Sequence, residues 1–384
     1  MDANDITIGQ ALKLEEQGDH AGAEAIYRRL LADDPSNAEL LNDHAAALIN
    51  LREYAAAEAD LTRLISLAPS FADAHINLAI VNFMLGRITR ANECAARAFG
   101  LAPHRRDYRD AWQALKSLPF FGAATTGLQG THAPERQVFM SAVVDLLKDT
   151  APQLAILEIG SFMGASLLTW ANAIERLHGG RATVVCVDPW GLGDTAPQYV
   201  KIMAEALVTN QAYEIFLHNA SLVPKNVTVQ PVRDLSENAL PPLRDGTFDI
   251  VYIDGCHYFR EALFDMLEGR RLVKDGGILC GDDLELQAGE CDLENARRHA
   301  REDYIRDSRS GCNFHPGVTL AAHETFGQVS SFSGFWAMRK KGMTFSRVSL
   351  ASARGVAPTH WPARSLDKIK SYFSTSSELG QLVD

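Results

Sequence analysis

The chain has 384 residues, of which 46% are hydrophobic and 22% are charged, and its formal net charge is −11. That length is enough for two or three domains, each with its own core. No run of Lys and Arg is long enough to follow a phosphate backbone, so we expect no nucleic-acid partner. No stretch approaches the ~20 apolar residues that span a bilayer, and residues 1–9 lack the order of a signal peptide. We therefore expect a cytoplasmic protein without a membrane partner.

The cysteines are scattered and form neither a C-x-x-C pair nor a zinc spacing. They are Cys94, Cys186, Cys256, Cys280, Cys291 and Cys312. Without an export signal, we expect reduced thiols. Cys256 lies beside a motif described below, and we interpret it as a small buried hydrophobe rather than a nucleophile.

The first third of the chain repeats with a period of 34 residues. Prolines recur at this spacing, at Pro35, Pro69 and Pro103. Alanines recur with them in two series, which are Ala11, Ala45 and Ala79, and then Ala23, Ala57 and Ala91. Small residues at both places let two antiparallel helices approach closely, and each proline ends one unit and starts the next. This pattern resembles the tetratricopeptide repeat.

We assign residues 1–118 to this repeat domain. Three units cover roughly residues 4–105, and an amphipathic segment at 107–118 would cap the apolar face of the last one. Two interpretations stay open, namely a groove that binds a peptide or protein and a scaffold that stabilises or dimerises the chain. Residues 119–134 are rich in Gly, Thr and Ala without periodicity, and we interpret them as a linker.

The rest of the chain alternates between apolar runs and amphipathic segments. A helix is predicted over 135–148 from the spacing of its apolar residues. The predicted strands are 155–159, 183–187, 227–231, 248–253, 277–280 and 334–338. This alternation predicts an α/β fold with a mostly parallel sheet.

The first predicted strand ends in a loop that carries Glu158, Gly160, Ser161, Gly164 and Ser166. A glycine turn at this place marks the binding crevice of an open α/β sheet. The N–H groups at the start of the following helix suit an anionic group such as a carboxylate. We therefore expect a ligand at this strand end.

The second predicted strand ends in Asp188, which is placed to accept hydrogen bonds from ribose hydroxyls, as in NAD-binding folds. Together with the glycine loop it predicts an adenosine-type ligand without saying which one. The alternative is that Glu158 and Asp188 are ordinary caps of strand ends.

Three acids follow the fourth and fifth predicted strands. They are Asp254 and the pair Asp282 and Asp283. The carboxyl ends of parallel strands meet at one edge, so we expect these side chains to converge. Like charges so close are costly unless a cation neutralises them, and oxygen ligands suit Mg²⁺, Ca²⁺ or Mn²⁺ rather than zinc. The alternative is that Asp282 and Asp283 form a turn or cap a helix.

The order of these motifs resembles metal-dependent O-methyltransferases, both the catechol type and bacterial enzymes that methylate sugars of macrolides. The motifs are E-x-G-x-x-x-G-x-S, the ribose acid, D-G-x-H and D-D. The segment 314–319, which leads to 334–338, is also similar to the bacterial group. The resemblance covers roughly residues 135–342 and implies a Rossmann-like, class I S-adenosylmethionine-dependent methyltransferase domain. Residues 343–384 are left as a C-terminal tail with one predicted helix, at 366–373.

The resemblance also implies roles for single residues. The metal, expected to be Mg²⁺, would be held by Asp254, Asp282 and Asp283, with His257 as the general base. The residues implied to bind S-adenosylmethionine are Glu158, Gly160, Ser161, Gly164, Ser166, Asp188 and Ser236, of which Ser236 contacts the adenine. His257 can alternatively be a metal ligand or a structural hydrogen-bonder.

Other polar residues near these motifs receive weaker assignments. His315, which precedes a proline, is interpreted as a loop or cap residue. The polar segment 285–311 is interpreted as a helix and loop with solvated charges, the alternative being a lid over the site.

The resemblance implies direct methyl transfer from a sulfonium to an oxygen, with the metal lowering the pKa of the attacking hydroxyl. The acceptor would be a hydroxylated small molecule or a glycan. The alternative is a protein-binding scaffold whose methyltransferase fold only senses the cofactor or is inactive, and the intact acids favour the enzyme. An iron oxygenase is disfavoured because the three carboxylates lack paired histidines. Whether the chain forms homo-oligomers is left open.

Overall fold

The structure is a computed structural model that describes residues 7–121, 134–191, 206–361 and 363–383. The chain divides into two compact units, residues 1–123 and 124–384. No described helix is both long and apolar enough to cross a membrane.

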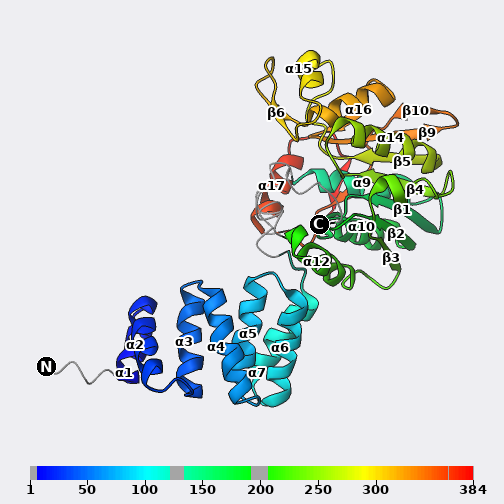
Figure 1. Ribbon diagram of the computed structural model, residues 1–384. Helices are drawn as coiled ribbons and strands as arrows, with labels where there is room; N and C mark the ends of the chain where they lie inside the picture. Colours follow the sequence, from blue (N-terminus) through cyan, green and yellow to red (C-terminus); the bar gives the residue numbers. More distant parts are fainter. Residues whose placement is uncertain (1–6, 122–133, 192–205, 362, 384) are drawn as a thin grey trace. The chain divides into compact units, whose positions relative to one another are not determined.

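The described part of the first unit is helical. Its helices are α1 (Ile8–Glu16), α2 (His20–Asp33), α3 (Ala38–Asn50), α4 (Tyr54–Leu67), α5 (Ala72–Met84), α6 (Ile88–Leu101) and α7 (Arg106–Ser117). Successive helices pack side by side in chain order (Figure 1). The pairs α1 and α2, α3 and α4, and α5 and α6 are the three predicted repeats.

The periodic alanines explain why these helices pair. All six of them are at most 2% exposed: Ala11, Ala23, Ala45, Ala57, Ala79 and Ala91. Larger side chains such as Leu61 and Leu64 are fully buried and fill the space between the hairpins. At the end of the stack, the buried Tyr108 of α7 donates to Asp73 of α5. The predicted tetratricopeptide repeats are therefore confirmed.

The second unit is built on one large sheet. Its strands are β1 (Gln153–Ile159), β2 (Arg181–Val187), β3 (Val227–Val232), β4 (Phe248–Ile253), β5 (Val273–Gly281), β8 (Ser330–Phe332), β9 (Phe335–Lys341) and β10 (Thr344–Arg347). The order is β10-β9-β5-β4-β1-β2-β3, with β8 also paired to β9. Strands β1 to β5 are parallel, whereas β8, β9 and β10 form antiparallel pairs. The predicted α/β, Rossmann-like methyltransferase fold is confirmed.

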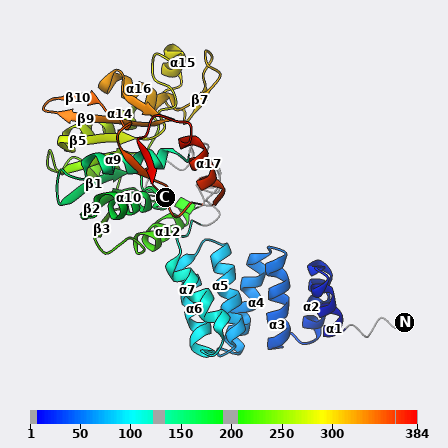
Figure 2. The same cartoon turned by 180° about the vertical axis from the view of Figure 1, so that it is seen from behind.

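Helices cover both faces of this sheet (Figure 2). On one face lie α9 (Arg136–Leu147) and α10 (Ala165–Ala173), and Trp170 of α10 packs edge-on against Tyr252 of β4. On the other face α14 (Phe259–Leu272) packs on α16 (Pro316–Phe326). This face buries the core formed by β1, β4, β5, α14 and α16. Because side chains alternate along a strand, Glu158 and Ile159 point to opposite faces.

The remaining elements are shorter or peripheral. They are η2 (Ile174–His178, a π-helix), α12 (Gln211–Ala220), α13 (Ser236–Ala239), α15 (Leu293–Arg298), α17 (Ala363–Phe373), β6 (Ile305–Arg306), β7 (Asn313–Phe314), β11 (Arg354–Val356) and β12 (Gln381–Val383). Strand β6 pairs with β7, and β11 pairs with β12.

The C-terminal segment packs against α9. The guanidinium of Arg354 donates to Asp145 at 2.8 Å, and the amide of Val356 donates to the hydroxyl of Ser141 at 2.8 Å. Strand β10 extends the large sheet. The helix predicted at 366–373 lies within α17. The described residues after 342 are thus part of the second unit's core rather than a detached tail.

Candidate functional site

The carboxyl ends of five neighbouring strands are joined by hydrogen bonds at one edge of the sheet. Each residue that follows a strand donates its amide N–H to the last residue of the adjacent strand: Asp188 to Val232 at 3.2 Å, Gly160 to Val187 at 2.9 Å, Asp254 to Ile159 at 2.8 Å, and Asp282 to Ile253 at 3.1 Å. This continuous ladder brings the predicted glycine loop, ribose acid and metal ligands to the same edge.

A cavity of about 500 Å³ opens at this edge. Six residues singled out from the sequence line it: Gly160, Asp188, Ser236, Asp254, His257 and Asp283. Its volume lies within the range of pockets that bury a small organic ligand. Five others are not part of its wall: Glu158, Ser161, Gly164, Ser166 and Asp282.

Gly160 allows the β1 loop to touch the end of β4. Its φ is +88°, and a Cβ placed on it would lie 1.9 Å from the carbonyl oxygen of Asp254. Only glycine fits such a close backbone contact in a left-handed conformation. The glycine therefore holds the predicted cofactor loop directly against the first predicted metal ligand.

Glu158 lies beneath the loop, fully buried. It accepts hydrogen bonds from the hydroxyl of Ser166 and from the thiol of Cys186. Burial raises the pKa of Glu158 to about 7, although these hydrogen bonds oppose the shift. Glu158 and Ser166 therefore fix the start of α10 in position, and Ser161 is likewise buried.

Asp188 organises the backbone around the cavity. Its carboxylate accepts the amide N–H of Phe162 at 2.8 Å and that of Trp190 at 2.7 Å. Burial nevertheless raises its pKa. The backbone N–H of Ser161 is a third hydrogen-bond donor to it. A carboxylate has about four lone-pair sites, so about one of them remains for a ligand's hydroxyl.

Arg136 of α9 neutralises the acids that follow β5. Its Nη1 donates to Asp282 at 2.8 Å and to Asp283 at 3.1 Å, and its Nη2 donates to Glu285 at 2.7 Å. Its Nε donates to the carbonyl of Ser333 at 2.5 Å. One buried guanidinium therefore faces three carboxylates, and the cluster keeps a net negative charge.

His257 sits between two carboxylates. Its Nε2 lies 2.9 Å from Asp283 and its Nδ1 lies 2.6 Å from Asp303, which belongs to the segment before β6. Burial alone would lower the pKa of His257, but the charges of the two acids outweigh it and raise the pKa well above its usual value. The ring of His315 lies 4.5 Å from that of His257, edge to face.

The carboxylates differ in their electrostatics. Burial and the charges of Asp283 and Asp282 raise the pKa of Asp254 well above its usual range. Burial also raises the pKa of Asp282, to about 6, against the opposing charge of Arg136. The pKa of Asp283 is lowered, because the charges of His257, His315 and Arg136 outweigh its burial. Asp254 is thus the acid whose charge the neighbouring groups compensate least.

Three overlapping groups of described residues could hold a metal ion. In each group, three ligand atoms lie within 4.8 Å of one another. The first group is Asp254, His257 and Asp283. The second is Asp283, Glu285 and His315, and the third is His257, Asp303 and His315. Asp282 belongs to none of them, and its Oδ1 accepts from Arg136 and from the amide of Asp283. The structure therefore brings Asp254 and Asp283 together and turns Asp282 toward the guanidinium.

Sequence reasoning missed several members of this site. Arg136, Asp303 and Glu285 were not singled out, because their partners are distant in the sequence. His315 was interpreted as a loop or cap residue; it stands at the N-cap position of α16 without a side-chain cap bond, and its Nδ1 lies 3.0 Å from Glu285. The sequence signal that indicates the position of His315 is a His-Pro step directly before an apolar helix, since it places His315 at the start of that helix.

Comparisons with known proteins bear on both units. A family model described as a methyltransferase domain matches residues 157–284, and one described as a tetratricopeptide repeat matches residues 42–105. No curated protein gives a significant match.

Among solved structures, the chain is similar to the second tetratricopeptide domain of human RPAP3 in complex with an HSP70 peptide. The identity is 24%, over 28% of this chain and 91% of that one, with a TM-score of 0.27. It is also similar to the first such domain of Spaghetti (RPAP3) bound to an HSP90 peptide, with 22% identity over 30% and 93% of the chains and a TM-score of 0.28. The crystal structure of MamA gives 21% identity over 29% and 64%, with a TM-score of 0.27. By its family matches and its sheet, the chain carries tetratricopeptide repeats followed by a methyltransferase domain.

Proposed function

We propose that the second unit transfers a methyl group from S-adenosylmethionine to a hydroxyl of a small molecule or glycan, with help from a divalent metal. The observation that carries this proposal is the single cavity at the strand ends. Its lining includes two groups of residues, which we call the first wall (Gly160, Asp188 and Ser236) and the second wall (Asp254, His257 and Asp283), and the two meet where Gly160 contacts the carbonyl of Asp254. The predicted cofactor residues and the acidic centre thus line one cavity.

The residues of the first wall fit the cofactor, which would supply an electrophilic methyl on a sulfonium. Asp188 keeps a lone pair for a ribose hydroxyl beside its backbone donors. Gly160 leaves room for a ligand at the end of β1. Ser236 begins α13 and would contact the adenine.

The residues of the second wall fit a divalent cation. Asp254 and Asp283, whose carboxylate oxygens lie within 4.8 Å of each other, would hold it, whereas the predicted third ligand Asp282 pairs with Arg136. Oxygen ligands favour Mg²⁺ or Mn²⁺. A bound ion would hold an acceptor hydroxyl and lower its pKa.

His257 would take the acceptor's proton. Without a cation, Asp303, 2.6 Å from Nδ1, and Asp283, 2.9 Å from Nε2, favour the protonated form of His257. A cation bound to Asp283 would weaken the second contact, and Asp303 would then hold the remaining proton on Nδ1 and leave Nε2 to receive one. S-adenosylmethionine would supply the methyl group to the acceptor oxygen, and Nε2 would take the proton that this oxygen gives up. General-base help of this kind contributes about 10²- to 10⁴-fold in rate.

A screen of acceptors tests this proposal. The full chain is incubated with S-adenosylmethionine, Mg²⁺ and a panel of catechols, sugars and other diols, and products are read by mass as the gain of one methyl. We expect a product with at least one class, abolished by a chelator and by Asp254→Asn. The control is Asp245→Asn, because Asp245 is exposed and lies outside the cavity wall. Transfer that persists with a chelator would refute the metal's role.

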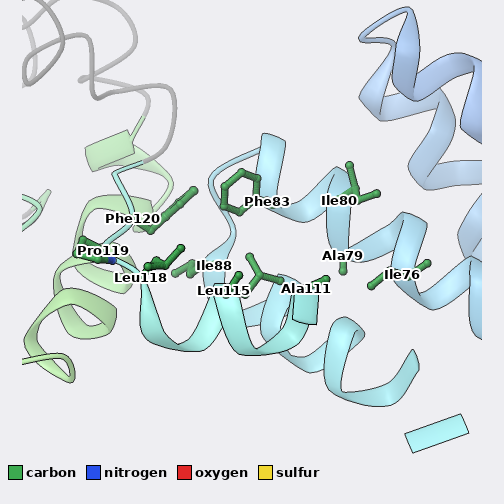
Figure 3. A pocket seen from close by; sticks show the side chains of 11 residues that line it. Ile76, Ala79, Ile80, Phe83, Ile88, Ala111, Leu115, Leu118, Pro119 and Phe120 are labelled. Atoms are coloured by element: carbon green, nitrogen blue, oxygen red, sulfur yellow. The ribbon is translucent and has the colours of Figure 1, made fainter. Parts of the chain in front are cut away.

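We also propose a peptide-binding function for the repeats, on a specific observation. An apolar pocket of about 330 Å³ lies between α5, α6 and α7 (Figure 3). The side chains of Ile80 and Phe83 on its rim are 42% and 38% exposed. Phe120 closes one end, with its ring 4.7 Å from that of Phe83. The pocket can bury one large apolar side chain of a partner.

The acidic residues of the repeats indicate which residues of a partner would stand next to its apolar side chain. Burial raises the pKa of Glu15 on α1, and the negative charge of Asp43 on α3 adds to this shift. Burial likewise raises the pKa of Asp43, and the charge of Asp73 on α5 adds to it. Successive repeats therefore present acids along their first helices. We infer a partner segment with basic residues around an apolar anchor.

Fluorescence anisotropy tests the peptide proposal with two synthetic peptides. Both carry one phenylalanine, flanked in one by lysines and in the other by glutamates. We expect binding of the lysine peptide alone, weakened at least tenfold by Ile80→Asp. The matched control is Leu67→Asp, because Leu67 is 51% exposed on α4 and is not part of the pocket. Equal binding of both peptides, or no effect of Ile80→Asp, would refute the proposal.

A further inference from the structure

Asp265 is a buried acid on the wall of the cavity with an unused hydrogen-bonding atom. It lies on α14, is 2% exposed, and lines the same cavity as Asp188 and Ser236. Its Oδ1 is buried without a hydrogen-bond partner among the described residues. A buried polar atom left unpaired costs free energy, so such an atom facing a cavity points to a ligand that donates to it.

Among the described residues, the groups that act most on the Asp265 carboxyl are acids and a hydroxyl. Its neighbours in electrostatic range are Glu237, Glu261 and Glu268, all acidic, and Ser236 donates a hydrogen bond to it. Burial raises the pKa of Asp265 to about 7. No candidate metal group among the described residues contains it. The missing partner is therefore a neutral N–H or O–H donor rather than a metal or an arginine.

The place of Asp265 identifies the part of the ligand that it meets. Ser236 follows β3, and Asp282 and Asp283 follow β5, which lies four strands away in the sheet. A Cβ placed on Gly255 would lie 3.3 Å from Asp265, so this acid also borders the turn after β4. Asp265 thus belongs to the part of the cavity that Ser236 lines, where the proposed function puts the adenine.

We propose that Asp265 recognises the exocyclic amino group of the adenine and makes the site selective for adenosine-type cofactors. This inference rests on the proposed function, because it takes S-adenosylmethionine as the ligand. The amino group donates and can fill Oδ1, and the ring nitrogen beside it accepts from a protonated carboxyl. In a 6-oxo purine, a carbonyl oxygen that accepts replaces the amino group, and the neighbouring ring nitrogen carries a proton that it donates. Oδ1 of Asp265 would then face an acceptor.

Calorimetric titration of the full chain tests this assignment with S-adenosylhomocysteine and S-inosylhomocysteine, its 6-oxo analogue. Because the 6-oxo compound loses two hydrogen bonds and leaves a buried atom of Asp265 unpaired, we expect a preference of about 10- to 100-fold for the adenine compound. Asp265→Leu should reduce the preference to less than about threefold. Asp265→Asn should keep most of it, because the amide accepts from the amino group and donates to the ring nitrogen.

The control is Arg260→Gln, because Arg260 is exposed on the same helix and is not part of the cavity wall. It should bind as the unaltered protein does, and melting temperatures identify variants that do not fold. Equal affinity of the unaltered protein for both compounds would overturn the role of Asp265 and leave the proposed function intact. An unchanged preference in Asp265→Leu would overturn it as well. Failure to bind S-adenosylhomocysteine at all would overturn the proposed function.

Discussion

Arg136 donates to Asp282 at 2.8 Å and so ties the first helix of the methyltransferase domain to the tip of β5. The two residues are 146 positions apart. The same guanidinium reaches Asp283 and Glu285, and it lies so close to Gly334 that a Cβ there would be 2.1 Å from Nη2. Arg136 therefore supplies part of the positive charge that the strand-end acids need.

The first prediction concerns removal of that charge. Arg136→Gln leaves the carboxylates buried and facing one another, and breaking a buried ion pair costs about 3–5 kcal/mol. We expect a lower melting temperature in the variant, together with a larger stabilisation by Mg²⁺ than in the unaltered protein, because the ion replaces the lost charge. Thermal unfolding with and without Mg²⁺ measures both. The control is Arg244→Gln, because Arg244 is exposed and is not part of the cavity wall. Equal responses to Mg²⁺ in the two proteins would contradict the argument.

The second prediction concerns the close contact at Gly160. Gly160→Ala must both adopt a left-handed backbone and move the chain at Asp254. Gly179→Ala is the matched control, because Gly179 also has a positive φ, of +70°, but nothing lies within 4 Å of its Cβ position. Both variants lose about 1 kcal/mol to the backbone conformation. We expect only Gly160→Ala to bind S-adenosylhomocysteine at least tenfold more weakly, by calorimetry.

Much of this arrangement follows from local sequence signals. The 34-residue alanine period determines how the helices pair, and apolar runs that end in Gly160, Asp188 and Asp254 place those residues at strand ends. Parallel strands have their carboxyl ends at one edge, so the convergence of these residues is a matter of topology. These features could therefore be predicted from the sequence without knowing which distant residues touch.

The remainder depends on contacts between distant segments. Nothing near Arg136 in the sequence indicates that it faces Asp282 and Asp283, and nothing near Asp303 indicates that it touches His257. The prediction of three converging acids therefore lacked the guanidinium that binds two of them, Asp282 and Asp283. Asp265 was missed for another reason, since it follows the helical periodicity of α14 and only its burial and unpaired oxygen distinguish it.

The third prediction concerns the pH dependence of stability through Glu158. The pKa of Glu158 is about 7 in the folded protein, whereas the ordinary pKa of a glutamate is 4.5, so folding favours the protonated acid. The stability from this group is fully present below pH 4.5 and is lost as the pH rises to about 7. Glu158→Gln cannot titrate and still offers an oxygen to Ser166. We expect the variant to gain stability relative to the unaltered protein between pH 5 and 8, by roughly 2–3 kcal/mol.

Chemical denaturation of both proteins at several pH values measures this difference. Comparing the two proteins removes the contribution of all other titrating groups. A difference that stays constant across the range would show that Glu158 does not titrate as stated.

The fourth prediction concerns the partner of His257. Asp303→Asn removes a charge that raises the pKa of His257 and weakens the contact that fixes its tautomer, so less of the neutral ring carries its proton on Nδ1 and presents a free Nε2. We expect kcat to fall about 10- to 100-fold while KM for the acceptor changes little. The neighbouring Glu302→Gln is the matched control, because that side chain is 58% exposed. An equal loss in both variants would mean that the segment, rather than the contact, matters.

The most direct test of the central claim is a titration of the full chain with Mn²⁺, followed by the electron paramagnetic resonance signal of the free ion. The account predicts one site per chain. It also predicts that binding weakens by at least tenfold in Asp254→Asn and in Asp283→Asn, but not in Asp245→Asn. Binding that is absent from the unaltered protein, or unchanged when Asp254 and Asp283 are both replaced, would contradict it.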